Sequence, residues 1–109
     1  MENKTALIRA LNDSFRTTFI GGRVLMTASV QCLPEYIRSK ALSAVREFKD
    51  FNEDNDPHGE HDFGAFEVDG QKFFWKIDYY DENACYGSED PSNPEKTTRV
   101  LTLMLAEDY

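Results

Sequence analysis

The segment NDPHGEHDFG, residues 55–64, contains residue types that could do chemistry, because it places both histidines of the chain among three carboxylates. Imidazole nitrogens and carboxylate oxygens together form the kind of ligand set that zinc, manganese or iron accepts. The candidate ligands are His58, His61 and Asp62. No H-E-x-x-H pattern surrounds them, so the segment meets only the ligand-type requirement, and a metal site is one alternative.

Acid/base catalysis is a second alternative for this segment. His61 would act with Asp78, the residue that faces it across a predicted hairpin, and Glu60 or Asp62 would assist. A carboxylate beside an imidazole orients the ring and favours its protonated form. The sequence lacks a nucleophile elbow and a glycine-rich phosphate loop, however, and we expect no cofactor.

The third alternative is a turn that only leads the chain into a strand. Asp56 and Pro57 begin a turn, and Gly59 provides a backbone conformation that other residues adopt rarely. The carboxylate of Asp54 or Asp56 could also accept hydrogen bonds from backbone amides that a preceding helix leaves free. Such a structural role requires no ligand and no substrate.

The elements that must position this segment follow from the spacing of apolar residues. Apolar side chains recur at helical spacing over 5–18 and again from Pro34 to Phe48, which predicts two amphipathic helices. The run 23–30 is rich in β-branched and apolar residues and predicts a strand. Residues 100–105 alternate and favour a strand, although their spacing would also suit a helix.

A β-hairpin is predicted around Asp69 and Gly70, since this dipeptide fits a two-residue type I′ turn and β-rich runs flank it. A loop of this length sets the register, so Val68 pairs with Gln71 and each earlier residue pairs with its mirror image. The face assigned to the core consists of Phe66, Val68, Phe73, Trp75, Ile77 and Tyr79.

Length and composition place these elements in a single domain, residues 1–109. A chain of 109 residues with 40% apolar residues is large enough for one hydrophobic core. The predicted fold class is α+β: an antiparallel sheet of about four strands with two helices packed on one face, in the order α-β-α-β-β-β. No apolar run is long enough to span a membrane and no secretory signal is present, so we expect a soluble cytoplasmic protein.

The two cysteines are too few for a disulfide framework and are expected to be free thiols in a reducing cytoplasm. Cys32 follows the strand-like run and is predicted to be buried. Cys85 lies in a polar loop, and a nucleophilic role for it would require a base nearby.

The formal net charge of −8 is unevenly distributed along the chain. Residues 1–49 carry eight basic and four acidic side chains, whereas residues 50–95 carry fourteen acidic side chains and two lysines. Such a negative field repels nucleic acid and anionic membranes, and it attracts a basic protein surface. We therefore expect no direct binding to nucleic acid or to a membrane. The alternative role of these carboxylates is to keep a small protein soluble.

Several stretches resemble, in order along nearly the whole chain, a family of small bacterial proteins of unknown function that are often found on plasmids and in phage-related regions. These stretches are IRALNDSFR, GGRVLMT, LPEYIRSKALSAVREF, NDPHGEHDFGAFEVDGQKFFWKIDYYD, YGSEDPSNP and RVLTLMLAEDY, of which NDPHGEHDFG and FWKIDYYD are the most distinctive. The family has no agreed activity or catalytic residues to transfer. Its setting on mobile elements implies proteins that handle or block host defence.

Charge and resemblance together lead to a specific functional expectation. An acidic protein from a mobile element can occupy the basic nucleic-acid groove of an enzyme, with its carboxylates in the place of phosphates. The expected partner is a basic protein surface, such as that of a nucleic-acid-binding effector, and the expected activity is anti-CRISPR-like inhibition. The candidate contacts lie on two acidic loops and are Asp50, Glu53, Asp54, Asp56, Asp81, Glu82, Glu89 and Asp90.

Overall fold

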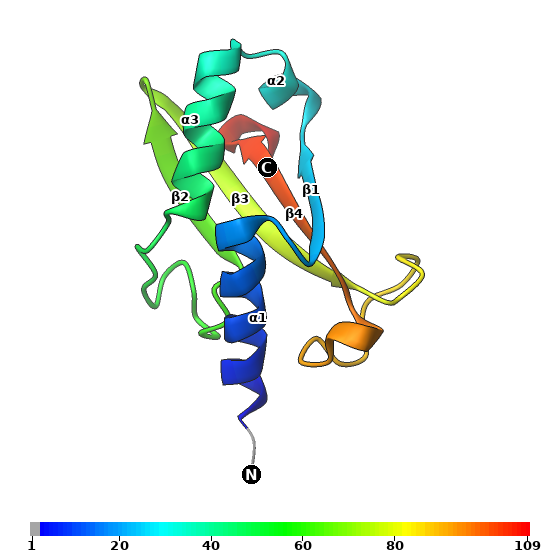
Figure 1. Cartoon of the computed structure of the whole chain (residues 1–109). Helices are drawn as coiled ribbons and strands as arrows, with labels where there is room; N and C mark the ends of the chain where they lie inside the picture. The colour runs from blue at the N-terminus through cyan, green and yellow to red at the C-terminus, as the bar shows by residue number, and fades with distance from the viewer. Residues whose placement is uncertain (1–2) are drawn as a thin grey trace.

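The computed structural model describes residues 3–109 and shows a four-stranded sheet with two long helices on one of its faces (Figure 1). The helices are α1 (Lys4–Thr18), α2 (Ala28–Gln31) and α3 (Glu35–Arg46). The strands are β1 (Gly22–Met26), β2 (Phe63–Val68), β3 (Gln71–Tyr80) and β4 (Thr98–Leu105). Two short 3₁₀ turns, η1 (Pro94–Lys96) and η2 (Ala106–Asp108), flank β4. The α+β class and the predicted element order are confirmed, with the short helix α2 as an addition.

The sheet is mixed, which differs from the antiparallel sheet predicted. Its strand order is β1-β4-β3-β2. The pairs β2 with β3 and β3 with β4 are antiparallel, whereas β1 runs parallel to β4. Parallel neighbours need a long connection between them, and α2, α3 and the β2–β3 hairpin supply it. No local pattern in the sequence says which strand β1 will join.

Both long helices begin and end close to the predicted positions. The side chain of Asn3 accepts a hydrogen bond from the N–H of Ala6 (3.3 Å) and caps α1, which ends where Phe19 adopts the left-handed conformation (φ 60°). Pro34 precedes α3, at a position that needs no N–H donor. The core between the helices and the sheet consists of Phe15, Val30, Ala41, Val45, Phe48, Phe73, Trp75, Ile77, Leu101, Leu103 and Leu105.

The predicted strand over 23–30 is too long. β1 ends at Met26, and Thr27 begins a turn of helix, α2, instead of continuing the strand. Val30 reaches the core from α2 and is fully buried, so its apolar character reflects helical rather than strand packing. Cys32 comes after this helix and is exposed, which corrects the prediction that it is buried. Both cysteines are free, as expected.

The predicted hairpin and its register are confirmed. Val68 pairs with Gln71 across a two-residue loop, and the positive φ angles of Asp69 (51°) and Gly70 (79°) are those of a type I′ turn. The last segment forms a strand, not a helix, and β4 lies inside the sheet, where it pairs with both β1 and β3. None of the helices in residues 3–109 is long and apolar enough to cross a membrane.

Candidate functional site

The segment 55–64 packs against polar side chains of α1 in a continuous network, here called the polar network. Its members come from α1, from the connection 47–62 and from the neighbouring ends of β3 and β4. They are Asn12, Asp13, Arg16, Asp56, Glu60, His61, Asp62, Tyr79 and Arg99.

His61 is held between two carboxylates of this network. Its Nδ1 donates to Asp13 Oδ1 (2.9 Å) on α1, and its Nε2 lies 3.6 Å from Asp56 Oδ2. The N–H of His61 also donates to Asp56 Oδ1 (3.0 Å), and the imidazole stacks on Phe51 with ring centroids 3.8 Å apart. Because both ring nitrogens face carboxylates of the protein, neither is directed at a substrate. His61 therefore fixes the connection 47–62 against α1.

The expected pairing of His61 with Asp78 is wrong. The backbone hydrogen bonds between β2 and β3 extend as far as Asp62 and Ile77, where Ile77 N–H donates to Asp62 O (2.8 Å), and His61 and Asp78 would be the next pair. At His61 the backbone has a positive φ (56°), which takes the chain out of the strand and toward α1. Asp78 instead pairs with the ammonium group of Lys76 (3.0 Å) on its own strand.

The alternative metal ligands are not assembled into a site. Within residues 3–109, no group of three or more histidine, cysteine, aspartate or glutamate side chains could hold a metal ion. His58 is exposed, whereas His61 and Asp62 are engaged by other members of the polar network. The three residues are close in sequence, but the turn between them gives them different surroundings.

The turn alternative describes the segment best. Gly59 has a φ of +71°, and Asp56 accepts the N–H of His61, so two of the expected local roles are present. The cap is Asp56 and not Asp54. The N–H of Asp54 is instead bound by Asn52 Oδ1 (2.8 Å), so an asparagine shapes the earlier part of the connection.

Asn12 is the centre of the polar network and is completely buried. Its Nδ2 donates to Glu60 O (2.9 Å) and to the Tyr79 hydroxyl (2.7 Å), while its Oδ1 accepts from Arg99 Nε (2.7 Å). One side chain of α1 thus joins the connection 47–62, β3 and β4. Burial lowers the pKa of Arg99, and its guanidinium, which is removed from water, donates to this oxygen and to Pro91 O.

Arg16 links the network to the core. Its guanidinium donates to Asp13 Oδ1 (3.2 Å) and to Val45 O (2.9 Å) near the end of α3. The same group lies 5.4 Å from the ring centroids of both Phe51 and Trp75. These contacts hold α1, α3 and the connection 47–62 together through one buried cation.

Two carboxylates share the hydroxyl group of Tyr79, which lies 3.1 Å from Glu60 Oε1 and 3.3 Å from Asp62 Oδ2. Burial raises the pKa of Asp62, and the neighbouring charge of Glu60 raises it further. Burial also raises the pKa of Tyr79, so its hydroxyl keeps its proton and donates to the carboxylates.

Replacing Asp62 by asparagine should stabilise the protein at neutral pH. The raised pKa of Asp62 means that the folded protein holds this proton more tightly than the unfolded chain does, so ionisation above the ordinary value of 3.8 opposes folding. We expect Asp62→Asn to raise the free energy of unfolding at pH 7 by up to about 1 kcal/mol, and to leave it unchanged near pH 3. Urea denaturation at both pH values measures the difference.

The matched control for this prediction is Asp54→Asn in the same connection, because the side chain of Asp54 is exposed. Its stability should change little at either pH. If Asp62→Asn proves less stable than the wild type at pH 7, the ionised form of Asp62 supports the fold and the prediction is wrong.

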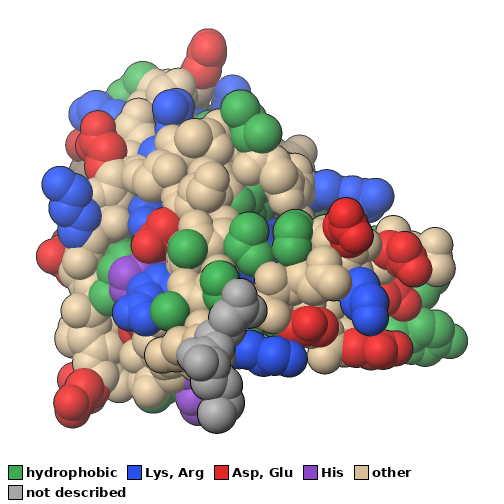
Figure 2. Space-filling model, turned by 60° about the horizontal axis from the view of Figure 1, so that its bottom comes forward, with side chains coloured by type: hydrophobic (Ala, Val, Ile, Leu, Met, Phe, Trp, Pro, Cys, Tyr) green, Lys and Arg blue, Asp and Glu red, His purple; other side chains and the backbone are tan. Residues whose placement is uncertain are grey.

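Most of the eight expected partner contacts lie at the surface, but Asp56 is buried and engaged by His61, which corrects that expectation. Asp81 and Asp90 are half-buried, and the exposed ones are Asp50, Glu53, Asp54, Glu82 and Glu89. Both acidic loops leave the sheet at the end where β2 begins, β3 ends and β4 begins. Figure 2 brings this end of the molecule forward and shows carboxylates exposed on it.

Four members of the polar network were not expected at the site from the sequence, namely Asn12, Asp13, Arg16 and Arg99, and Tyr79 was expected in the core. One signal was present, because Asn12 comes four residues after Ile8 and three before Phe15 on the apolar stripe of α1. Arg16 comes four residues after Asn12, on the same side of the helix. A polar side chain on a stripe that faces the core becomes buried and must find hydrogen-bond partners. The signal does not say which distant residues those partners are.

The fold and the network define a small α+β protein with a mixed sheet, a buried polar network under α1 and acidic loops at one end. Residues 26–108 match the family described as "Protein of unknown function (DUF3768)", and the chain belongs to this family. The match covers α2, α3 and all of β2, β3 and β4, but not α1, which contributes Asn12 to the network. No curated protein and no solved structure gives a significant match.

Proposed function

We propose that this chain is a small acidic interaction protein that blocks the nucleic-acid-binding surface of a host defence enzyme, in the manner of an anti-CRISPR protein. One observation carries the proposal: the connections 47–62 and 81–97, both of which carry exposed carboxylates, lie at the same end of the sheet, as the course of the chain in Figure 1 shows. Carboxylates spread over one surface can bind to a basic groove in place of the phosphates of a nucleic acid, because both groups are negatively charged. The resemblance to proteins of plasmids and phages supports a target in host defence.

The acidic loop after β3 is ordered by its own hydrogen bonds. Asp81 Oδ1 accepts from the N–H groups of Asn83 (3.2 Å) and Cys85 (3.0 Å), and the Asp81 N–H donates to Tyr86 O (2.6 Å). The exposed carboxylate of Glu82 projects from this closed turn. A loop that already holds its shape loses little conformational entropy on binding, which favours its use as a contact surface.

The same loop presents an exposed aromatic side chain among its carboxylates. Tyr86 is 77% exposed, although most large apolar side chains of the chain are at least partly buried. Tyrosine is enriched at the centres of protein interfaces, because its ring buries a large area and its hydroxyl keeps a polar partner. Tyr86 would therefore pack between basic side chains of the partner while Glu82 and Glu89 pair with them.

The other acidic loop is held in place by the polar network. His61 and Asp56 fix the end of the connection 47–62, and the exposed carboxylates come earlier in the same connection, at residues 50–54. The network thus has a structural role in the proposed function, since it keeps one half of the acidic surface from moving away from α1.

Charge reversal in the loop after β3 should abolish the interaction. We expect immobilised wild-type chain to capture a nucleic-acid-binding protein from a bacterial lysate, and Glu82→Lys/Glu89→Lys to capture at least about tenfold less, because repulsion replaces attraction. Capture by the wild type should also weaken as NaCl rises from about 0.05 to 0.3 M. The captured protein, once purified, should lose its nucleic-acid binding when the wild-type chain is added.

The matched control is Glu35→Lys/Glu107→Lys, which makes the same change of charge at exposed positions at the other end of the sheet. This variant should capture as much as the wild type, and circular dichroism checks that both variants fold. The proposal fails if capture does not depend on salt, if both variants lose it equally, or if the captured protein binds nucleic acid as well with the chain as without it.

A further inference from the structure

The face of the sheet that α1 and α3 leave uncovered carries a trough along β4. Its floor consists of Val100, Thr102 and Met104, which alternate along β4 with residues of the core. In the register of β1 with β4, Arg23 lies beside Val100 and Leu25 lies beside Thr102. The side chains of β1 therefore form one wall of the trough, and Leu25 is 52% exposed there.

The opposite wall comes from β3. In the antiparallel register, Asp78 lies beside Val100 and Lys76 lies beside Thr102. Each of these two floor residues thus has one wall residue from β1 and one from β3. This arrangement follows from the alternation of side chains along all three strands, and it uses no residue of the polar network.

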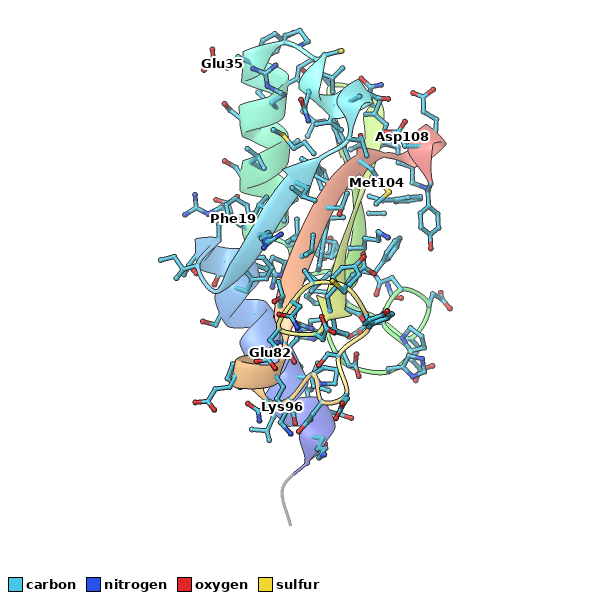
Figure 3. The ribbon with its side chains drawn as sticks, turned by 90° about the vertical axis from the view of Figure 1, so that its right-hand side faces the viewer. Phe19, Glu35, Glu82, Lys96, Met104 and Asp108 are labelled. Atoms are coloured by element: carbon cyan, nitrogen blue, oxygen red, sulfur yellow. The ribbon has the colours of Figure 1, made fainter. Side chains whose placement is uncertain are left out.

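One end of the trough is closed by η2 and the residue after it. Asp108 accepts hydrogen bonds from Thr27 Oγ1 and Ser29 Oγ, both at 2.9 Å, and this ties η2 to the region where α2 begins. Tyr109 then lies against Phe74, with ring centroids 5.5 Å apart. Figure 3 shows Met104 and Asp108 on the side of the sheet away from α3.

The other end of the trough is closed by Tyr80 and Ala84. The floor from Val100 to Met104 is about 13 Å long, at roughly 3.3 Å per residue of strand. An open trough of this length, with side chains along both sides and at both ends, suits a small molecule better than a long segment of another chain.

Two cations and two carboxylates line the trough, so the cation that forms no ion pair within the described part of the chain decides where an acidic ligand group would bind. None of the ion pairs formed among residues 3–109 involves Arg23. Lys76, in contrast, is paired with Asp78 at 3.0 Å on the opposite wall. An anionic ligand group would therefore meet the guanidinium of Arg23 on the β1 wall, where it can form a charge-assisted, bidentate contact.

We propose that this trough binds a small aromatic anion. The flat apolar body of the ligand lies on the floor against Val100 and Met104, and its acidic group pairs with Arg23. Tyr80 and Tyr109 at the two ends provide ring faces and edges that suit an aromatic body. The inference does not rest on the proposed function, because the exposed glutamates of the acidic loop take no part in it.

The probe for this site is anilinonaphthalene sulfonate, which combines an aromatic body with one anionic group and fluoresces in apolar surroundings. Titration of the full folded chain should give a saturable rise in fluorescence. In amide NMR spectra, the shifts should be confined to β1, β4, η2 and the facing part of β3. We expect Arg23→Gln to weaken binding by roughly tenfold or more, because it removes the charged contact to the sulfonate. Leu25→Ser should weaken it by a smaller factor.

Two matched controls lie outside the trough. Arg9→Gln removes a guanidinium from α1, and Ile20→Ser shortens an exposed apolar side chain (76% exposed) before β1. Both should bind the probe as the wild type does, and the NMR spectra show that each variant is folded. The proposal is wrong if binding does not saturate, if the control variants weaken it as much as Arg23→Gln, if the shifts fall on the helices, or if a dimer that buries the trough forms.

Discussion

The Asn12→Ala variant should lose about 2–4 kcal/mol of unfolding free energy. Asn12 is completely buried, and its side chain makes hydrogen bonds to Glu60 O, the Tyr79 hydroxyl and Arg99 Nε. Alanine can replace none of them. Arg99 accounts for much of the cost, because the Nε of its buried guanidinium loses its acceptor and only the bond to Pro91 O remains to offset desolvation.

Urea denaturation of the purified variant measures this loss, and Asn83→Ala is the matched control. Asn83 lies in the exposed loop after β3, so the same chemical change there should alter stability by no more than about 0.5 kcal/mol. The polar network would not be a major stabilising feature if the two variants proved equally stable.

The Gly64→Ala variant should lose about 2–3 kcal/mol, because a methyl group has no room at this position. Gly64 lies opposite Trp75 in the hairpin and is buried under Phe48. A Cβ atom there would lie 2.6 Å from Phe48 Cε1 and 2.8 Å from Phe48 Cζ, and it would also meet Trp75 Nε1. Neither ring can move without displacing the core, since Trp75 is fully buried and Phe48 nearly so.

Gly87→Ala is the matched control for this substitution. A Cβ atom at Gly87 would come no closer than 4.0 Å to any atom outside its neighbours in the chain, the nearest being Tyr79 O. Thermal and urea denaturation should therefore give the Gly87→Ala variant the stability of the wild type, within about 0.5 kcal/mol. Equal losses in the two glycine variants would mean that crowding against Trp75 and Phe48 does not determine the effect, because the lower entropy of the unfolded chain would by itself stabilise both variants.

The hairpin shows how far local rules reach in this protein. Asp69 and Gly70 demand a type I′ turn, and a two-residue loop allows only one register, so the position of Gly64 opposite Trp75 follows from the amino-acid sequence alone. The two long helices follow in the same way from the spacing of apolar residues and from caps such as Asn3.

β1 shows where those rules end. The run 23–30 is rich in apolar and β-branched residues, yet it divides at Thr27 into a strand and one turn of helix. A segment this short has the same apolar spacing in either form, and the contact of Val30 with the core decides between them. The parallel pairing of β1 with β4 is likewise decided by contacts between residues that are far apart in the sequence.

The same distinction between local and long-range information applies to the candidate site. Local sequence is enough to establish that carboxylates, two histidines and turn residues gather in residues 55–64, that Gly59 shapes a turn there, and that the acidic charge belongs to the middle of the chain. Composition and local backbone preference are properties of neighbouring residues, which is why the sequence itself reveals them.

What those residues do depends on packing between distant elements. The left-handed backbone at His61 directs its ring to Asp13 on α1 instead of Asp78, and Asp56 becomes a buried partner of His61 instead of an exposed contact. Asn12 joins the site because α1 packs across the ends of β3 and β4. Spacing along a chain specifies which side chains share a face, but the partner of a buried polar group is selected by the tertiary fold.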